Sequence, residues 1–150
     1  MLILVASTGV LGYWYWQRNF YSKDILKLEI LGQDTADFAK EITYTVKYKN
    51  NGSVRLEDAK LIFEYPGHSI TSDGKALWQE IPLEDIYPGE EKTINFKARL
   101  MGQEGDILTA KASVDYKPKN LNASYESATT FSTQIKSVPL NFELDLPSDT

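Results

Sequence analysis

Alternation of hydrophobic and polar side chains is the feature that most limits how this chain can fold. In residues 41–50, EITYTVKYKN, hydrophobic side chains occupy every second position, and mostly threonine and lysine lie between them. Residues 92–100 and 107–116 show the same period of two. Successive side chains of a strand point to opposite faces, so this pattern predicts strands with one buried and one solvated face. After residue 24, no stretch has the period of about 3.6 residues that marks an amphipathic helix.

Turn residues separate the alternating runs. Residues 50–52 (Asn-Asn-Gly), 66–67 (Pro-Gly) and 87–90 (Tyr-Pro-Gly-Glu) each lie between two runs. We interpret residues 50–52 as a turn whose residues tolerate positive φ angles. About seven strands, with turns roughly every 8 to 12 residues, are typical of an immunoglobulin-like fold. The sequence therefore predicts an all-β domain, an immunoglobulin-like antiparallel β-sandwich, over residues 22–137.

The alternation also predicts which side chains fill the core of this sandwich. Each strand contributes the residues of one parity, because these share one face. The predicted inward-facing residues are Ile42, Tyr44, Val46, Tyr48, Leu61, Phe63, Tyr65, Ile94, Phe96, Ala98, Leu100, Leu108, Ala110, Ala112, Val114, Tyr116, Tyr125, Phe131 and Ile135. Residues 67–74 are predicted to be a polar loop, followed by a short strand over residues 76–81.

An uncharged segment precedes the predicted sandwich. Residues 1–16 contain no charged side chain, and residues 13–16 are all aromatic. As a helix they span about 24 Å, and Phe20 and Tyr21 extend them toward the roughly 30 Å of a hydrocarbon core. Aromatic rings gather at the headgroup level, which favours a single-pass transmembrane helix over residues 1–21. The alternatives are a cleaved signal peptide, which would show basic residues before its apolar stretch, and a buried core element.

Two arguments bear on the orientation of this helix. Arg18 and Lys23 follow the segment, and the positive-inside rule would then place its C-terminal side in the cytoplasm. Large domains, however, translocate largely regardless of charge. On the strength of the fold, we expect a β-domain outside the cytoplasm, anchored to the cell membrane through residues 1–21.

The two ends of the predicted domain resemble one another. Residues 26–30, LKLEI, are similar to residues 140–144, LNFEL, and an Asp-Thr pair follows each within a few residues. Similarity at a fixed period is typical of tandem repeats. Residues 138–150 are therefore either the last strand of the sandwich or the start of a second, truncated repeat.

Two stretches carry a resemblance to a known group of proteins. In residues 44–66, one strand ends in Asn-Asn-Gly and the next in Tyr-Pro, and in residues 86–100 a Pro-Gly-Glu turn opens an alternating strand. This pattern resembles the immunoglobulin-like repeat domains of bacterial and archaeal cell-surface proteins, of the adhesion-related and conserved-repeat type. The resemblance covers roughly residues 40–116. It implies a stalk or adhesive module, and it carries over no catalytic or binding residues.

Composition excludes several kinds of site. The chain has no cysteine, which rules out disulfides, thiolate metal sites and thiol nucleophiles. Its only histidine is His68, and its acidic pairs lack the spacing of a calcium-binding loop. The formal net charge is −5, with no basic stripe, so nucleic acid is not an expected partner. We therefore predict no enzymatic activity, no catalytic residue, no cofactor and no metal ion.

The predicted function is that of a structural spacer or an adhesive, protein-interacting module at the cell surface. Trp78 is interpreted first as a filler of the core between the sheets, because tryptophan buries a large area. As the alternative, Trp78 is an exposed platform for sugar rings, and the loop of residues 67–74 adds His68 and Asp73 as ligand contacts. The chain would then bind carbohydrate or peptidoglycan. Its predicted partners are accordingly other surface proteins or envelope glycans, besides the membrane.

Overall fold

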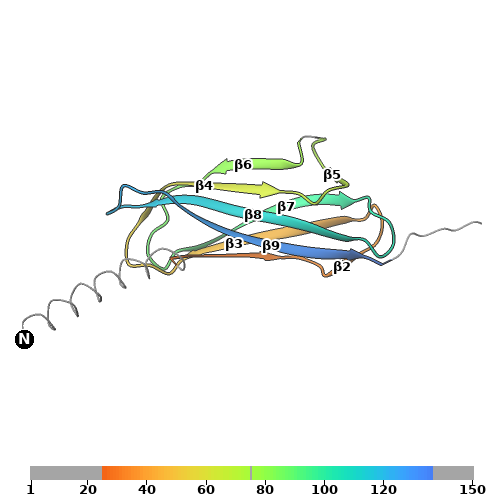
Figure 1. The fold of residues 1–150 in the computed structure, drawn as a ribbon, viewed down its shortest axis with the longest axis horizontal. Helices are drawn as coiled ribbons and strands as arrows, with labels where there is room; N and C mark the ends of the chain where they lie inside the picture. Colours follow the sequence, from red (N-terminus) through yellow and green to blue (C-terminus); the bar gives the residue numbers. More distant parts are fainter. Residues whose placement is uncertain (1–24, 75, 137–150) are drawn as a thin grey trace, which may run out of the picture.

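The computed structural model describes residues 25–74 and 76–136 (Figure 1). The predicted transmembrane helix over residues 1–21 and the predicted last strand or second repeat over residues 138–150 lie outside these residues. Within the described part, there is no helix with the length and hydropathy that a membrane crossing requires.

Two packed sheets make up the described part of the chain. One has four strands in the order β1-β3-β7-β5, and the other has five in the order β2-β9-β8-β4-β6 (Figure 1). The strands are β1 Leu26–Leu31, β2 Thr35–Ala36, β3 Glu41–Asn50, β4 Leu56–Glu64, β5 Ser69–Thr71, β6 Trp78–Pro82, β7 Glu91–Leu100, β8 Ile107–Pro118 and β9 Tyr125–Ile135. This architecture confirms the all-β prediction and is consistent with an immunoglobulin-like β-sandwich.

The core lies where the alternation places it. Every predicted inward-facing residue of β3, β4 and β8 is buried, and so are Phe96, Ala98 and Leu100 of β7. The Phe63 and Phe96 rings, from opposite sheets, stack with centroids 4.1 Å apart. Ile94, Tyr125 and Phe131 are only partly buried, although they pack against the core. The alternation therefore predicts correctly which side chains of the long strands point into the core. Only Ile94, Tyr125 and Phe131 are less buried than predicted.

The described chain has more strands than the predicted seven, because two are very short. β2 pairs with β9 in the parallel direction, so the sandwich is not purely antiparallel as predicted. β5 lies inside the predicted polar loop of residues 67–74 and pairs with β7 from Ser69↔Leu100 to Thr71↔Ala98. Strands of two or three residues are too short to show alternation, which is why the pattern does not reveal them.

The turn over residues 50–52 forms for a different reason than predicted. None of these three residues adopts a positive φ angle; elsewhere in residues 25–74 and 76–136, the residues that do are Ala39, Asp58, His68, Gly74, Gly89 and Gly105. Instead, the side chain of Asn50 is fully buried and bonds to the surrounding backbone. Asparagine is favoured in turns also because its amide can replace backbone partners, and this property decides the turn here.

The strand directions place the two ends of the described chain far apart. β2 continues β1 and runs parallel to β9, so β9 begins near the end where β1 begins and finishes at the opposite end. Ile25, directly before β1, therefore lies at one end of the sandwich, and Lys136, directly after β9, at the other; Figure 1 shows these two strand ends on opposite sides. β8 has 12 residues, which at roughly 3.3 Å per residue is a length of about 40 Å.

Candidate functional site

Trp78, the first residue of β6, lies on the outside of the sandwich. It pairs with Glu64, whereas its neighbour Gln79 pairs with the buried Phe63. The Trp78 side chain therefore points away from the other sheet, and the residue is 56% exposed. The first interpretation, that Trp78 fills the core between the sheets, is wrong, because Phe63, Phe96 and Tyr44 occupy that space. The parity of β6 could have shown this, since Trp78 shares its face with the exposed Glu80 and Pro82.

A polar groove lies next to β6, between the edges of the two sheets. Its volume is about 290 Å³. The lining residues are Tyr65, Thr71, Ser72, Asp73, Gln79, Asn95, Phe96 and Lys97. β5 pairs with β7 only over Leu100 to Ala98, so Asn95 and Lys97 lie beyond the reach of this pairing. The result is a groove lined by hydroxyl, amide, carboxylate and ammonium groups together with the aromatic rings of Tyr65 and Phe96.

The other two predicted ligand contacts divide between this groove and the loop. Asp73 lines the polar groove, and its charge adds to burial in raising the pKa of Tyr65. His68 is exposed with a φ angle of 58°, and its carbonyl oxygen accepts a hydrogen bond from the Met101 backbone. His68 is not among the groove's lining residues. The structure thus brings Asp73, but not His68, to a groove beside the strand that carries Trp78.

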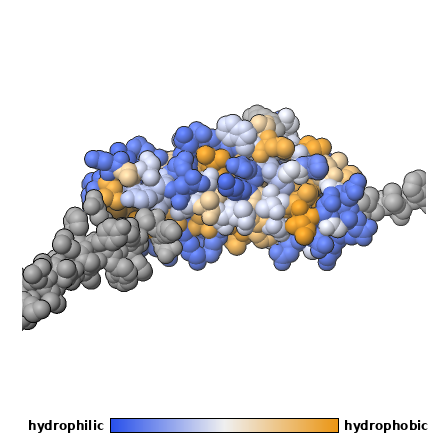
Figure 2. All heavy atoms as spheres, in the orientation of Figure 1, coloured by the Kyte–Doolittle hydropathy of each residue, from blue (hydrophilic) through white to orange (hydrophobic). Residues whose placement is uncertain are grey.

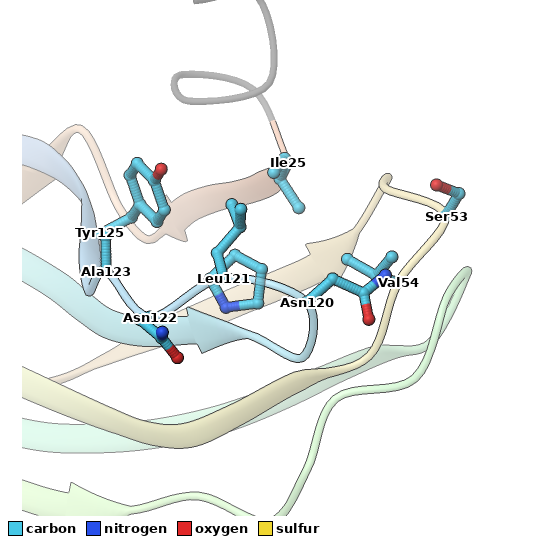
Figure 3. A pocket seen from close by; sticks show the side chains of 9 residues that line it. Ile25, Ser53, Val54, Asn120, Leu121, Asn122, Ala123 and Tyr125 are labelled. Carbon is cyan, nitrogen blue, oxygen red and sulfur yellow. The ribbon is translucent and has the colours of Figure 1, made fainter. Parts of the chain in front are cut away.

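A second, larger groove lies at the end of the sandwich where Ile25 is found (Figure 3). We call it the end groove; its volume is about 690 Å³. It is lined by Ile25, Ser53, Val54, Pro118, Asn120, Leu121, Asn122, Ala123 and Tyr125. None of these side chains is charged, although 25% of the chain's residues are. The sequence prediction missed this groove, and its one local signal is Leu121, an apolar residue within a polar turn.

A charged loop lies at the same end, beside the start of β7. Arg55 forms ion pairs with Glu57 and Asp85, and its guanidinium lies 5.7 Å from the centroid of the Tyr87 ring. The carboxylate of Glu90 accepts a hydrogen bond from the Tyr87 backbone N–H at 2.9 Å. That bond, together with the neighbouring Lys92, lowers the pKa of Glu90. These charged groups pair with one another, and none of them lines the end groove.

A third groove, of about 290 Å³, lies over β1, β3 and the start of β7 and is lined by Lys27, Glu29, Lys47, Lys49, Asn51 and Glu91. The face seen in Figure 2 is mostly hydrophilic, with separate hydrophobic patches rather than one continuous area. In residues 25–74 and 76–136, no three histidine, aspartate or glutamate side chains lie close enough together to hold a metal ion.

Comparison with solved structures supports the fold. The chain is similar to the CARDB domain of the PF1109 protein from Pyrococcus furiosus, in a crystal structure in complex with di-metal ions. The TM-score is 0.55 at 22% sequence identity, covering 76% of this chain and 91% of that chain. A solution NMR structure of the same domain gives a TM-score of 0.55 at 22% identity, with 77% and 97% covered. No family model matches the chain, and no curated protein matches it. The likeness therefore shows an immunoglobulin-like β-sandwich, and it shows the fold alone.

Proposed function

We propose that this protein is a non-enzymatic, membrane-anchored module of the cell surface that acts as a spacer or as an adhesive, protein-interacting domain. The observation that carries the proposal is the path of the chain through the sandwich. β1 begins at one end of the sandwich and β9 finishes at the other (Figure 1), and the longest strand, β8, has 12 residues and so extends about 40 Å. A domain built this way separates whatever precedes it from whatever follows it.

The packed core suits such a role. The two sheets enclose a continuous cluster of buried side chains, in which the Phe63 and Phe96 rings stack and Tyr65 lies edge-on to Phe63. Tight packing of this kind resists deformation. In the proposal, residues 1–21 hold the module in the cell membrane and the β-domain lies on the extracytoplasmic side. Partner proteins would contact loops or exposed edge strands such as β6.

Protease accessibility of the full chain in intact and lysed cells tests this proposal. Digestion of the β-domain in intact cells is the expected result. Protection until lysis would place the domain in the cytoplasm, in agreement with Arg18 and Lys23 as topology signals, and would overturn the surface role.

A second candidate function, binding of carbohydrate or peptidoglycan, is favoured by the exposure of Trp78. Aromatic faces are common platforms for apolar faces of ligands, and Trp78 is 56% exposed on an edge strand. The polar groove beside β6 adds Asp73, Gln79 and Asn95, whose oxygen and nitrogen atoms suit the hydroxyl groups of a sugar. Envelope glycans are the partners that this candidate function implies.

Pull-down of the full chain with peptidoglycan and with defined glycans tests the second candidate. If the platform is used, Trp78→Ala abolishes retention. Tyr87→Ala is the matched control, because Tyr87 is also aromatic, is 55% exposed and lies away from the polar groove. Equal retention of both variants and the unmodified chain would overturn the glycan-binding candidate and leave the spacer proposal standing.

A further inference from the structure

We propose that the end groove seats against the surface of the lipid bilayer in which the chain is anchored, with Leu121 in contact with lipid (Figure 3). This inference rests on the proposed membrane anchoring and deepens it. It makes the Ile25 end of the sandwich a membrane-contacting face rather than one held away from the bilayer on a free tether.

The first argument is the short connection between the groove and the uncharged segment. Ile25 lines the end groove, and the uncharged run ends at Trp16. Residues 17–24 can extend over at most about 29 Å, and as a helix they cover about 12 Å. An anchor in the bilayer therefore keeps this end of the domain near the headgroups, whichever form the connection takes.

The second argument is the chemistry of the groove. Its lining combines aliphatic side chains with neutral hydrogen-bonding groups, such as the amides of Asn120 and Asn122 and the hydroxyl of Tyr125. The interfacial layer of a bilayer accepts this mixture, because it solvates apolar surface and polar groups together. Leu121 lies at the groove with 37% of its surface exposed. Exposed apolar surface at this place gains by contact with lipid instead of water.

The charges around the groove indicate which lipid it suits. Lys119 is exposed beside the groove, whereas on the neighbouring loop Asp85 is paired with Arg55 and Glu84 with Lys92. Charges that are paired with one another attract an anionic surface only weakly, and Lys119 alone adds little. The contact we propose is therefore one of apolar burial, and it requires no anionic lipid.

Site-specific fluorescence in vesicles tests the contact. Because the chain has no cysteine, Leu121→Cys provides a single attachment point for a polarity-sensitive dye, and Asn122→Cys provides a second that keeps Leu121 in place. The matched control is Ile107→Cys, which is 67% exposed and lies at the opposite end of the sandwich, opposite Gln134. The full chain is reconstituted in phosphatidylcholine vesicles that contain nitroxide-labelled lipid, and flotation is measured in the same samples.

We expect the full chain to float with the vesicles and the dye at positions 121 and 122 to be quenched by nitroxide lipid. The dye at position 107 is expected to remain unquenched by lipid and open to iodide in the water. Addition of anionic lipid is expected to leave the quenching at position 121 unchanged.

Several outcomes would overturn the inference. A floating chain whose position 121 is as open to iodide as position 107 would refute the lipid contact while leaving the anchor intact. Shielding of position 121 from both quenchers would show that protein, either residues 17–24 or a second copy, covers the groove. Quenching that requires anionic lipid would refute the neutral chemistry. A chain that does not float would refute the anchoring proposal, and the inference with it.

Discussion

Asn50 links two loops, the one between β3 and β4 and the one between β6 and β7, at the Ile25 end of the sandwich. Its amide nitrogen donates to the carbonyl oxygens of Val54 and Ile86, each at 2.9 Å, and its side-chain oxygen accepts from the Gly52 backbone N–H at 2.9 Å. Its own backbone bonds to Gly89 and Glu90. Asn50 is completely buried; its bond to Ile86 is buried too, whereas the bonds to Val54 and Gly52 are partly buried.

Asn50→Ala is expected to lower the free energy of unfolding by about 2 to 4 kcal/mol. The substitution leaves two carbonyl oxygens and one N–H group without their buried partner, and each such loss costs on the order of 1 to 3 kcal/mol, with partial relief as water enters. Urea denaturation followed by circular dichroism measures the change. The adjacent Asn51 is exposed, so Asn51→Ala should stay within about 0.5 kcal/mol. Equal losses at both positions would contradict the role assigned to the Asn50 side chain.

The buried tyrosines give the fold a sensitivity to alkaline pH. Burial raises the pKa of Tyr44, Tyr48 and Tyr65 above the ordinary value of about 10. Below pH 10 or so, folded and unfolded chains both hold these protons, so the contribution to stability is complete. As the pH rises further, the unfolded chain loses protons that the folded chain retains, and stability falls.

The free energy of unfolding should therefore be nearly flat from about pH 7 to pH 9 and should decline above about pH 10. Tyr44→Phe should make this decline less steep, because one of the shifted groups is removed. Denaturation curves of both proteins across this range provide the measurement. If the two declines have the same slope, Tyr44 does not carry the shift.

The long strands could be predicted from sequence, whereas the short ones and the grooves could not. β3 and β8 bury one parity of side chains along their length, and β7 does so from Phe96 to Leu100, so the period is clear. β2 and β5 form because β9 and β7 supply partners, and their own two or three residues carry no period. The end groove joins Ile25, Val54 and Leu121, which are far apart in sequence. Proximity of that kind depends on the whole sheet order and leaves no local pattern.

A β-bulge explains why the alternation of β4 is interrupted near its start. Between Glu57 and Lys60, β4 advances three residues while β8 advances only two, from Lys117 to Asp115. Asp58 lies within this bulge with a φ angle of 50°. The left-handed conformation is accessible to aspartate, and it is strongly disfavoured for β-branched residues.

Asp58→Val is expected to destabilise the domain by about 1 to 2 kcal/mol, because valine pays the steric cost of this conformation. Asp58→Gly should lie within about 1 kcal/mol of the unmodified chain, because glycine adopts positive φ without strain. Asp58 is exposed, so lost packing contributes little to either variant. Thermal denaturation ranks the three proteins. A valine variant as stable as the glycine variant would mean that the bulge is not held in the left-handed region.

Across the whole molecule, the terminal strands lie so that tension along the long axis loads them in shear. β1 pairs antiparallel with β3 from Leu26↔Asn50 onward, and β9 pairs with both β8 and β2. Because Ile25 and Lys136 lie at opposite ends, pulling them apart slides β1 and β9 along their neighbours (Figure 1). A surface spacer under load would be pulled in this direction.

Single-molecule force spectroscopy can compare this direction with another in the same chain. Cysteine handles at Lys27 and Lys136, both exposed, pull along the long axis, and the full chain in detergent offers no competing thiol. Handles at Ile107 and Lys136 lie at one end, where Ile107 is opposite Gln134, and they peel β9 from β8 one residue pair at a time. We expect a higher unfolding force for the first pair, because shear breaks many hydrogen bonds together whereas peeling breaks them in sequence. Equal forces in the two directions would show that the sandwich is not built to carry load along its axis, which would weaken the spacer role and favour an adhesive one.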